Sequence, residues 1–106
     1  MANALSSSNA FAALAEPMRL AIVERLAIGP MAVGDLAARL PVSRPAVSQH
    51  LKVLKEAGLV RDEAQGTRRI YRIDPAGLAQ IRQWLDRFWD ASLAAYANEV
   101  ELEEKS

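Results

Sequence analysis

Two short helical patterns joined by a proline-containing turn constrain the fold more than any other part of this chain. They occupy residues 33 to 58 and meet at Leu40-Pro41-Val42. In the second pattern Val47, Leu51 and Leu54 recur at spacings of four and three residues, so they form one apolar stripe that must pack inward. The sequence therefore predicts a helix-turn-helix whose second helix has one buried and one exposed face.

The exposed face of this second helix carries side chains that suit DNA. Guanidinium and amide groups can make paired hydrogen bonds to guanine and adenine edges, whereas hydroxyl and ammonium groups suit phosphates. We expect base contacts from Arg44 and Gln49, and an N-cap from Ser43 that can also contact a phosphate. The alternative for each position is a solvated side chain. The exposed positions are Arg44, Pro45, Ser48, Gln49, Lys52 and Lys55.

The charge distribution favours a polyanionic partner although the net charge is zero. Between Arg44 and Arg72 there are seven basic and three acidic residues, a local excess of four positive charges. From Asp74 onward there are three basic and seven acidic residues. Because Lys and Arg neutralise phosphates, the central segment is the part of the chain predicted to bind double-stranded DNA.

Size and composition indicate one soluble domain spanning residues 1–106. The chain has 51% apolar and 25% charged residues, values typical of globular proteins. It contains no apolar run long enough to cross a bilayer and no recognisable secretory signal, so we expect a cytoplasmic protein without a membrane partner. The sequence has no cysteine, which excludes disulfides and thiolate metal ligands.

Two further helices and a hairpin surround this unit. Ser6-Ser7-Ser8-Asn9 can cap a short first helix, and Pro17 begins a second helix that stops at Gly29-Pro30. Gly58 follows the second helix of the helix-turn-helix, the recognition helix, and is expected to end it. Residues 59–73 then predict a basic β-hairpin, the wing, with Ala64-Gln65-Gly66-Thr67 in its loop. The imperfect alternation in its second strand leaves the buried face undecided.

The last helix is predicted over residues 75–98, with a frayed end from Glu99 to Ser106. It carries more bulky apolar side chains than a small core can hold, so we expect a homodimer interface. The alternative is that this helix closes the core of the monomer.

The sequence resembles the ArsR family of bacterial winged-helix repressors over nearly its whole length. Three segments carry the resemblance: LAEPMRLAIVERLA at 14–27, PVSRPAVSQHLKVLKEAGLV at 41–60 and GTRRIYRID at 66–74. The segment SRPAVSQHLKVL resembles the corresponding segment in a branch of the family whose members are autoregulators and do not sense metals. The resemblance implies a mainly α winged helix-turn-helix in the order α-α-α-α-β-β-α, which dimerises through its first and last helices. Apolar spacing and resemblance together assign the dimer interface to Phe11, Leu14, Leu78, Ile81, Trp84, Leu85, Phe88, Trp89 and Tyr96.

The sequence departs from the metal sensors of that family. Their ligands are cysteines on the third helix, or Asp, His and Glu on the last helix. Here the third helix begins Ala32-Val33-Gly34-Asp35 and the last helix has no histidine. We therefore expect no metal site and no cofactor.

Enzyme activity is not expected, because no nucleophile accompanies the single histidine, His50. His50 lies at the edge of the buried stripe, where packing or a phosphate contact suits it better. The wing arginines can grip phosphates or pair with Asp62 or Glu63 across the hairpin. The predicted DNA-binding residues are Ser43, Arg44, Pro45, Ser48, Gln49, His50, Lys52, Lys55, Arg68 and Arg69.

The leading hypothesis is a homodimeric repressor that binds an inverted repeat with half-sites about 34 Å apart. One alternative is a winged-helix module that has lost specific DNA binding and docks onto another protein through its last helix. Another is a repressor switched by a small apolar effector held near Trp84, Phe88 and Trp89. The identity of any such effector is unknown from the sequence.

Overall fold

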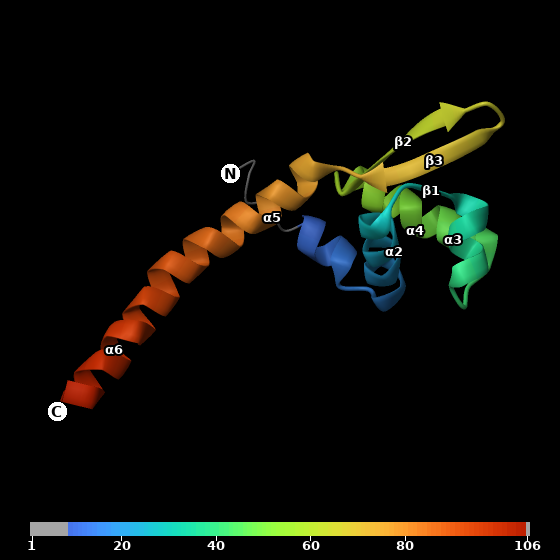
Figure 1. Ribbon diagram of the computed structural model, residues 1–106. Coiled ribbons are helices and arrows are strands. Elements are labelled where there is room, and N and C mark those ends of the chain that lie inside the picture. The colour runs from blue at the N-terminus through green and yellow to red at the C-terminus, as the bar shows by residue number, and fades with distance from the viewer. Residues whose placement is uncertain (1–8, 106) are drawn as a thin grey trace.

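The computed structural model describes residues 9–105 and shows a winged body from which one long helix projects (Figure 1). Residues 9–14 are helical, and the predicted caps at residues 6–8 lie outside the described residues. The remaining elements are α2 (Pro17–Ile28), β1 (Met31–Ala32), α3 (Val33–Arg39), α4 (Arg44–Glu56), β2 (Val60–Gln65), β3 (Arg68–Ile73), α5 (Pro75–Phe88), a π-helical turn η1 (Trp89–Leu93) and α6 (Ala94–Lys105). The predicted winged helix-turn-helix class is confirmed.

The core lies where α2, α3 and α4 meet the base of the wing. The predicted stripe of α4 is fully buried, which confirms its register. Full burial of each such side chain favours folding by about 1.5–3 kcal/mol, so this stripe anchors α4 to the body. The largest fully buried side chains are Ile22, Leu36, Val47, Leu51, Leu54, Leu59 and Val60.

Both ends of α4 are closed by local hydrogen bonds. At its start the Ala46 N–H donates to Ser43 Oγ at 3.3 Å, as the sequence predicts. At its end Gly58 has φ +78°, and its N–H donates to the Lys55 carbonyl at 3.0 Å. The Leu59 N–H donates to the Leu54 carbonyl at 3.0 Å, which completes a Schellman motif. These caps fix where the helix stops and the wing begins.

The wing belongs to a three-stranded antiparallel sheet in the order β1-β3-β2. Strand β1 pairs with β3, a contact that sequence analysis did not identify. The predicted four-residue loop was wrong, because Gln65 pairs with Arg68 and leaves only Gly66 and Thr67 between the strands. Gly66 has φ +63°, a backbone conformation that suits such a tight turn. Tyr71 and Ile73 pack against the core, which settles the buried face of β3.

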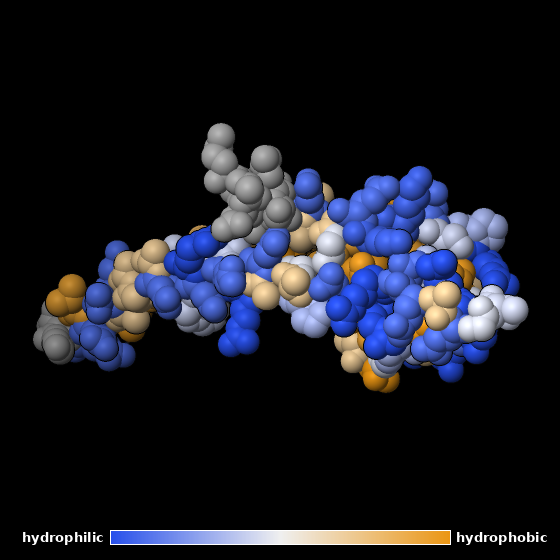
Figure 2. All heavy atoms as spheres, turned by 90° about the horizontal axis from the view of Figure 1, so that it is seen from above, coloured by the Kyte–Doolittle hydropathy of each residue, from blue (hydrophilic) through white to orange (hydrophobic). Residues whose placement is uncertain are grey.

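The last helix continues without interruption through α5, η1 and α6 to Lys105. The predicted frayed end from Glu99 was therefore wrong for residues 99–105, because glutamate, leucine and lysine favour helix and no glycine or proline interrupts them. Apolar and polar side chains alternate on its surface (Figure 2). Ile81 packs against the core, but Phe88 and Trp89 are largely exposed, so only the first half of this helix closes the monomer core. Among the described residues no helix is both long and apolar enough to span a membrane.

Candidate nucleic-acid interface

Helix α4 presents its predicted polar face to solvent. All six positions from Arg44 to Lys55 that sequence analysis assigned to this face are exposed, and Ser43 is exposed before them. The opposite stripe is held in the core, so the helix cannot rotate without exposing it. The exposed face therefore has a fixed orientation relative to the rest of the body.

The start of α4 lies close to the tip of the wing. Arg44 packs over Gly34 of α3, where an added Cβ would lie 3.8 Å from Arg44 Nη1. A depression beside it brings together guanidinium groups from residues far apart in the sequence. It is lined by Ala32, Val33, Gly34, Arg44, Thr67, Arg68 and Arg69. The fold thus joins the recognition helix and the wing into one basic surface.

Asp62 links the wing to the far end of α4. Its Oδ1 lies 2.8 Å from Lys55 Nζ, and its Oδ2 accepts a hydrogen bond from Arg69 Nη1 at 2.9 Å. The hydrogen bond from Lys55 lowers the pKa of the Asp62 carboxyl, and Arg69 adds to this effect although loss of hydration opposes it. Lys55 and Arg69, both predicted DNA contacts, are therefore already engaged with one carboxylate.

The other wing arginines also have acidic partners. Arg68 Nη2 lies 2.6 Å from Asp35 Oδ2 on α3, and Arg72 pairs with Glu63 across the hairpin. Sequence analysis considered Asp62 and Glu63 as partners of Arg68 and Arg69, and of these pairings only that of Arg69 with Asp62 forms. The involvement of Asp35 was missed, because nothing in the sequence signals that α3 reaches the wing.

Three cations of the central basic segment stay available. Within residues 9–105, no ion pair or side-chain hydrogen bond involves Arg44, Lys52 or Arg61. Two of these lie on the exposed face of α4 and the third on β2. The positive charge that is free to meet a polyanion is therefore concentrated beside the recognition helix.

His50 belongs to α4, and its side chain faces the start of α2. Its Nδ1 is 3.9 Å from Oε2 of Glu16, whose carboxylate caps α2 by accepting a hydrogen bond from the Arg19 N–H at 2.7 Å. That hydrogen bond lowers the pKa of the Glu16 carboxyl. Sequence analysis missed this cap, since glutamate is not among the favoured N-cap residues. The geometry gives His50 a packing contact rather than an open position on the α4 face.

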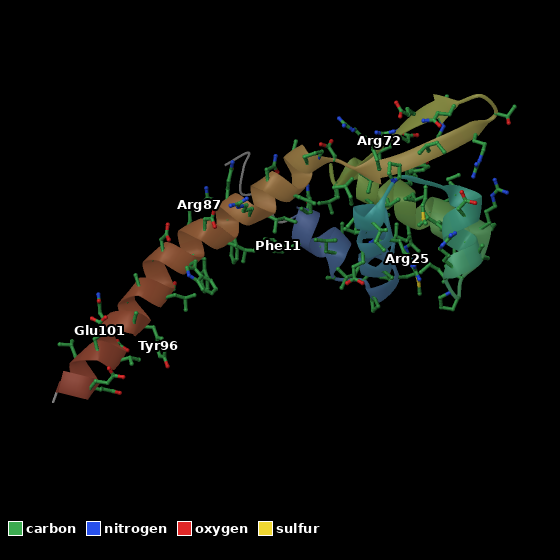
Figure 3. All side chains as sticks on the ribbon, viewed as in Figure 1. Phe11, Arg25, Arg72, Arg87, Tyr96 and Glu101 are labelled. Atoms are coloured by element: carbon green, nitrogen blue, oxygen red, sulfur yellow. The ribbon has the colours of Figure 1, made fainter. Side chains whose placement is uncertain are left out.

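An aromatic cluster joins the first helix to α5. The ring centroids of Phe11 and Trp84 are 5.1 Å apart in an edge-on arrangement, and Trp84 stacks on Phe88 at 5.5 Å. Figure 3 shows Phe11 beside α5, whereas Tyr96 projects from the far half of the helix with no other described element next to it. The structure thus brings together some of the predicted dimer residues and leaves the others exposed.

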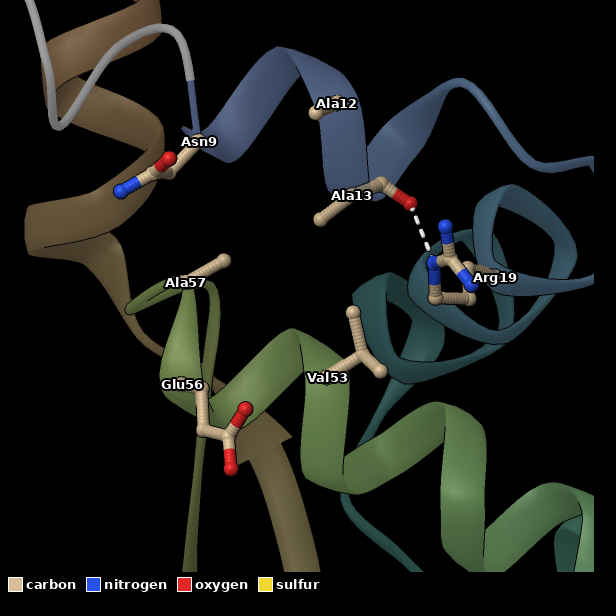
Figure 4. A pocket seen from close by; sticks show the side chains of 7 residues that line it. All are labelled: Asn9, Ala12, Ala13, Arg19, Val53, Glu56 and Ala57. Atoms are coloured by element: carbon tan, nitrogen blue, oxygen red, sulfur yellow. Dashed lines mark hydrogen bonds between the residues drawn. The ribbon is translucent and has the colours of Figure 1, made fainter.

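A separate cavity lies between residues 9–14, α2 and the end of α4 (Figure 4). The Arg19 Nε–H donates to the Ala13 carbonyl at its rim, at 2.7 Å. Trp84, Phe88 and Trp89, the residues considered for an apolar effector, do not line it. The side chains that line this cavity are Asn9, Ala12, Ala13, Arg19, Val53, Glu56 and Ala57. Among the described residues, no three His, Cys, Asp or Glu side chains gather as metal ligands would.

Comparison with known proteins connects this architecture to a family. Residues 16–62 match the family model described as "Bacterial regulatory protein, arsR family". Over 98 residues the chain is 61% identical to the HTH-type transcriptional regulator Rv2034 of Mycobacterium tuberculosis, and the alignment covers 92% of each protein. The chain belongs to the ArsR family. The resemblance noted in the sequence is confirmed, and this ArsR-family chain is a transcriptional regulator rather than an enzyme.

Two other matches cover most of the ArsR-family chain. The transcriptional repressor SdpR of Bacillus subtilis is 32% identical over 81 residues, which are 76% of this chain and 90% of that protein. The solution structure of a homodimeric winged helix-turn-helix DNA-binding domain, Mb0332 from Mycobacterium bovis, superposes with a TM-score of 0.67 at 32% identity. That superposition covers 83% of this chain and 82% of the other.

Proposed function

We propose that this ArsR-family regulator is a homodimeric repressor that binds an inverted-repeat operator through α4 and the wing. The observation that carries the proposal is the exposed polar face of α4 above a fully buried stripe. Such a helix fits the major groove, with Arg44 and Gln49 nearest the bases and Lys52 on phosphates. Ser43, Pro45 and Ser48 lie beside them, and His50 supports the helix from behind.

The dimer follows from the projecting helix. Its large apolar side chains are exposed in the single chain, a costly arrangement unless a second copy covers them. The homodimeric state of the Mycobacterium bovis domain supports this interpretation. In the dimer, two α4 helices lie about 34 Å apart and enter successive major grooves. The side chains that form the interface are Phe11, Leu14, Leu78, Ile81, Trp84, Leu85, Phe88, Trp89 and Tyr96.

No metal has a part in this proposal. The sequence has no cysteine and its last helix has no histidine, so the ligands of the family's metal sensors are missing. Operator binding takes place in the cytoplasm, where bacterial DNA lies, and occupation of a promoter by the dimer blocks transcription.

Binding to a DNA fragment that carries the protein's own promoter tests the proposal. Arg44→Ala and Gln49→Ala should each relax the preference at one base position by about 1–3 kcal/mol. Arg68→Ala should instead weaken binding to all sequences alike and reduce the salt dependence. Footprinting and titrations at several salt concentrations measure both effects.

Two outcomes would contradict this assignment. If both kinds of variant keep wild-type affinity at moderate salt, the contact residues are wrong. If the wild-type protein shows no sequence preference on any promoter fragment, the protein-docking alternative replaces the repressor. Tryptophan fluorescence during addition of apolar metabolites tests the remaining alternative, an effector near Trp84 and Trp89.

A further inference from the structure

Asp62 occupies an unusual place for a carboxylate on a DNA-binding wing. It follows the buried Val60 by two residues on β2, so both side chains point to the inner face of the hairpin, toward α4. Its partner in the register is Tyr71, which packs against the core. A negative charge here weakens attraction to DNA, so its place on this surface requires a physical reason.

The carboxylate is almost completely covered by its two cations. The side chain of Asp62 is 6% exposed, whereas those of Lys55 and Arg69 are 54% and 56% exposed. Each carboxylate oxygen binds one cation, and the outer donors of both cations still face solvent. Lys55 and Arg69 can therefore hold Asp62 on one side and meet phosphate oxygens on the other.

This arrangement adds a polar contact between the wing and α4 to the apolar packing at the base of the wing. Lys55 belongs to the last turn of α4, and Arg69 lies near the tip of β3. Arg69 lies on the wing with Asp62 and would move with it, but swinging the wing away from α4 would break the contact between Asp62 and Lys55, which lie 2.8 Å apart. The carboxylate thus holds the wing at one angle to the recognition helix.

We propose that Asp62 is a positioning residue for DNA recognition: it fixes the wing against α4 and orients Lys55 and Arg69 toward one stretch of the DNA backbone. The fixed geometry favours the operator over other sequences, and the negative charge reduces non-specific affinity. This inference rests on the proposed function, because it concerns how the same surface selects DNA.

The neighbouring Glu63 provides a matched control for the substitution of Asp62. It lies on the outer face of the same strand and pairs with Arg72, so its charge is equal but it does not touch α4. Removing either charge adds one net positive charge to the wing of each protomer. Only the loss of Asp62 also removes the contact between the wing and Lys55 of α4.

The experiment compares wild type, Asp62→Asn and Glu63→Gln on operator and random DNA at several salt concentrations. Both variants should steepen the dependence of log affinity on log salt, by about 0.9 for each protomer that contacts DNA. Asp62→Asn should also lower the ratio of operator to random affinity by about fivefold or more, the effect of one lost base contact. Glu63→Gln should keep the wild-type ratio.

A double variant separates charge from position and covers the case in which Asp62→Asn does not fold. Lys55→Met together with Asp62→Asn restores the wild-type net charge and leaves only Arg69, whose side chain is 56% exposed, as a charge at the link. We expect a wild-type salt dependence with a lowered affinity ratio. Thermal unfolding measures whether each variant is folded.

The outcomes distinguish this inference from the function on which it rests. A wild-type affinity ratio in Asp62→Asn, or in the double variant, overturns the positioning role while operator binding by the wild type stands. An unchanged salt dependence in folded Asp62→Asn also overturns it. If the wild-type protein itself does not prefer any operator, the proposed function fails first.

Discussion

Gly77 shows how a single residue controls the attachment of the long helix. It is buried in the first turn of α5, where a Cβ would lie 2.0 Å from the Gly58 carbonyl oxygen and 2.7 Å from its carbon. Both are backbone atoms of the turn that ends α4, so a side chain at position 77 has no space. The Asp74 N–H, which donates to the Leu59 carbonyl at 2.9 Å, holds the two turns together.

Gly77→Ala should therefore destabilise the protein by about 1–3 kcal/mol or more, because the added methyl group forces backbone atoms apart. The sign of the change in the free energy of unfolding is informative, since Gly→Ala at a solvent-exposed helix position stabilises by up to about 1 kcal/mol. Urea unfolding measures the difference. Gly29→Ala is the control, because nothing lies within 4 Å of a Cβ there, and its effect should stay within about 0.5 kcal/mol. Equal effects of the two substitutions would contradict the steric argument.

The wing is an element whose attachment depends on charge as well as on strand pairing. Its inner face contributes Val60, Tyr71 and Ile73 to the core. Two ion pairs also join it to the helices, Arg68 with Asp35 of α3 and Asp62 with Lys55 of α4. Asp35 and Asp62 therefore act at two ends of the hairpin. The stability of this attachment must depend on the ionisation of these carboxylates.

Asp62 makes that dependence measurable. Because its pKa is lower in the folded protein than in the unfolded chain, ionised Asp62 stabilises the fold at pH values above about 3.9, and this stabilisation is lost as the pH falls through the folded value. Asp62→Asn should lose stability at neutral pH and show a flatter decline below about pH 4. Urea unfolding between neutral and acidic pH measures both. Asp86→Asn on the exposed side of α5 is the control, and an identical acid decline in wild type and Asp62→Asn would contradict the prediction.

The whole molecule is a body with a projecting arm. Its principal extents are 66 × 30 × 20 Å, and the long dimension comes from the helix formed by α5, η1 and α6. The exposed aromatic side chains lie on that arm, whereas the face proposed to contact DNA belongs to α4 in the body. In the proposed function, dimerisation and DNA contact therefore use separate surfaces, which a substitution can address one at a time.

Trp89→Ser should dissociate the dimer without unfolding the body, since Trp89 is 64% exposed in the single chain. Loss of a central aromatic contact commonly costs about 2 kcal/mol or more in an interface, which corresponds to a dimer at least about 30-fold weaker. Sedimentation at micromolar concentration measures the change, and operator affinity should fall with it. Ile28→Ser is the control, because Ile28 is 80% exposed at the end of α2, away from the arm. An unchanged association state in Trp89→Ser would contradict the proposed interface.

Local patterns predicted much of this molecule. The stripe of Val47, Leu51 and Leu54 determined which side of α4 is buried, because helical spacing places these residues on one face whatever surrounds them. Ser43 and Gly58 determined where that helix begins and ends, since their hydrogen bonds involve only near neighbours. The family and the regulator class followed from the same segments.

Tertiary structure alone decided the contacts between residues distant in sequence. The pairing of Arg68 with Asp35, the packing of Gly77 against Gly58 and the entry of β1 into the sheet depend on how complete elements dock. Ion pairs are the clearest case: a basic wing has several acidic neighbours within reach along the chain, and their energies differ too little for spacing to choose among them. Docking makes the choice, because it removes water from one carboxylate and leaves the others exposed.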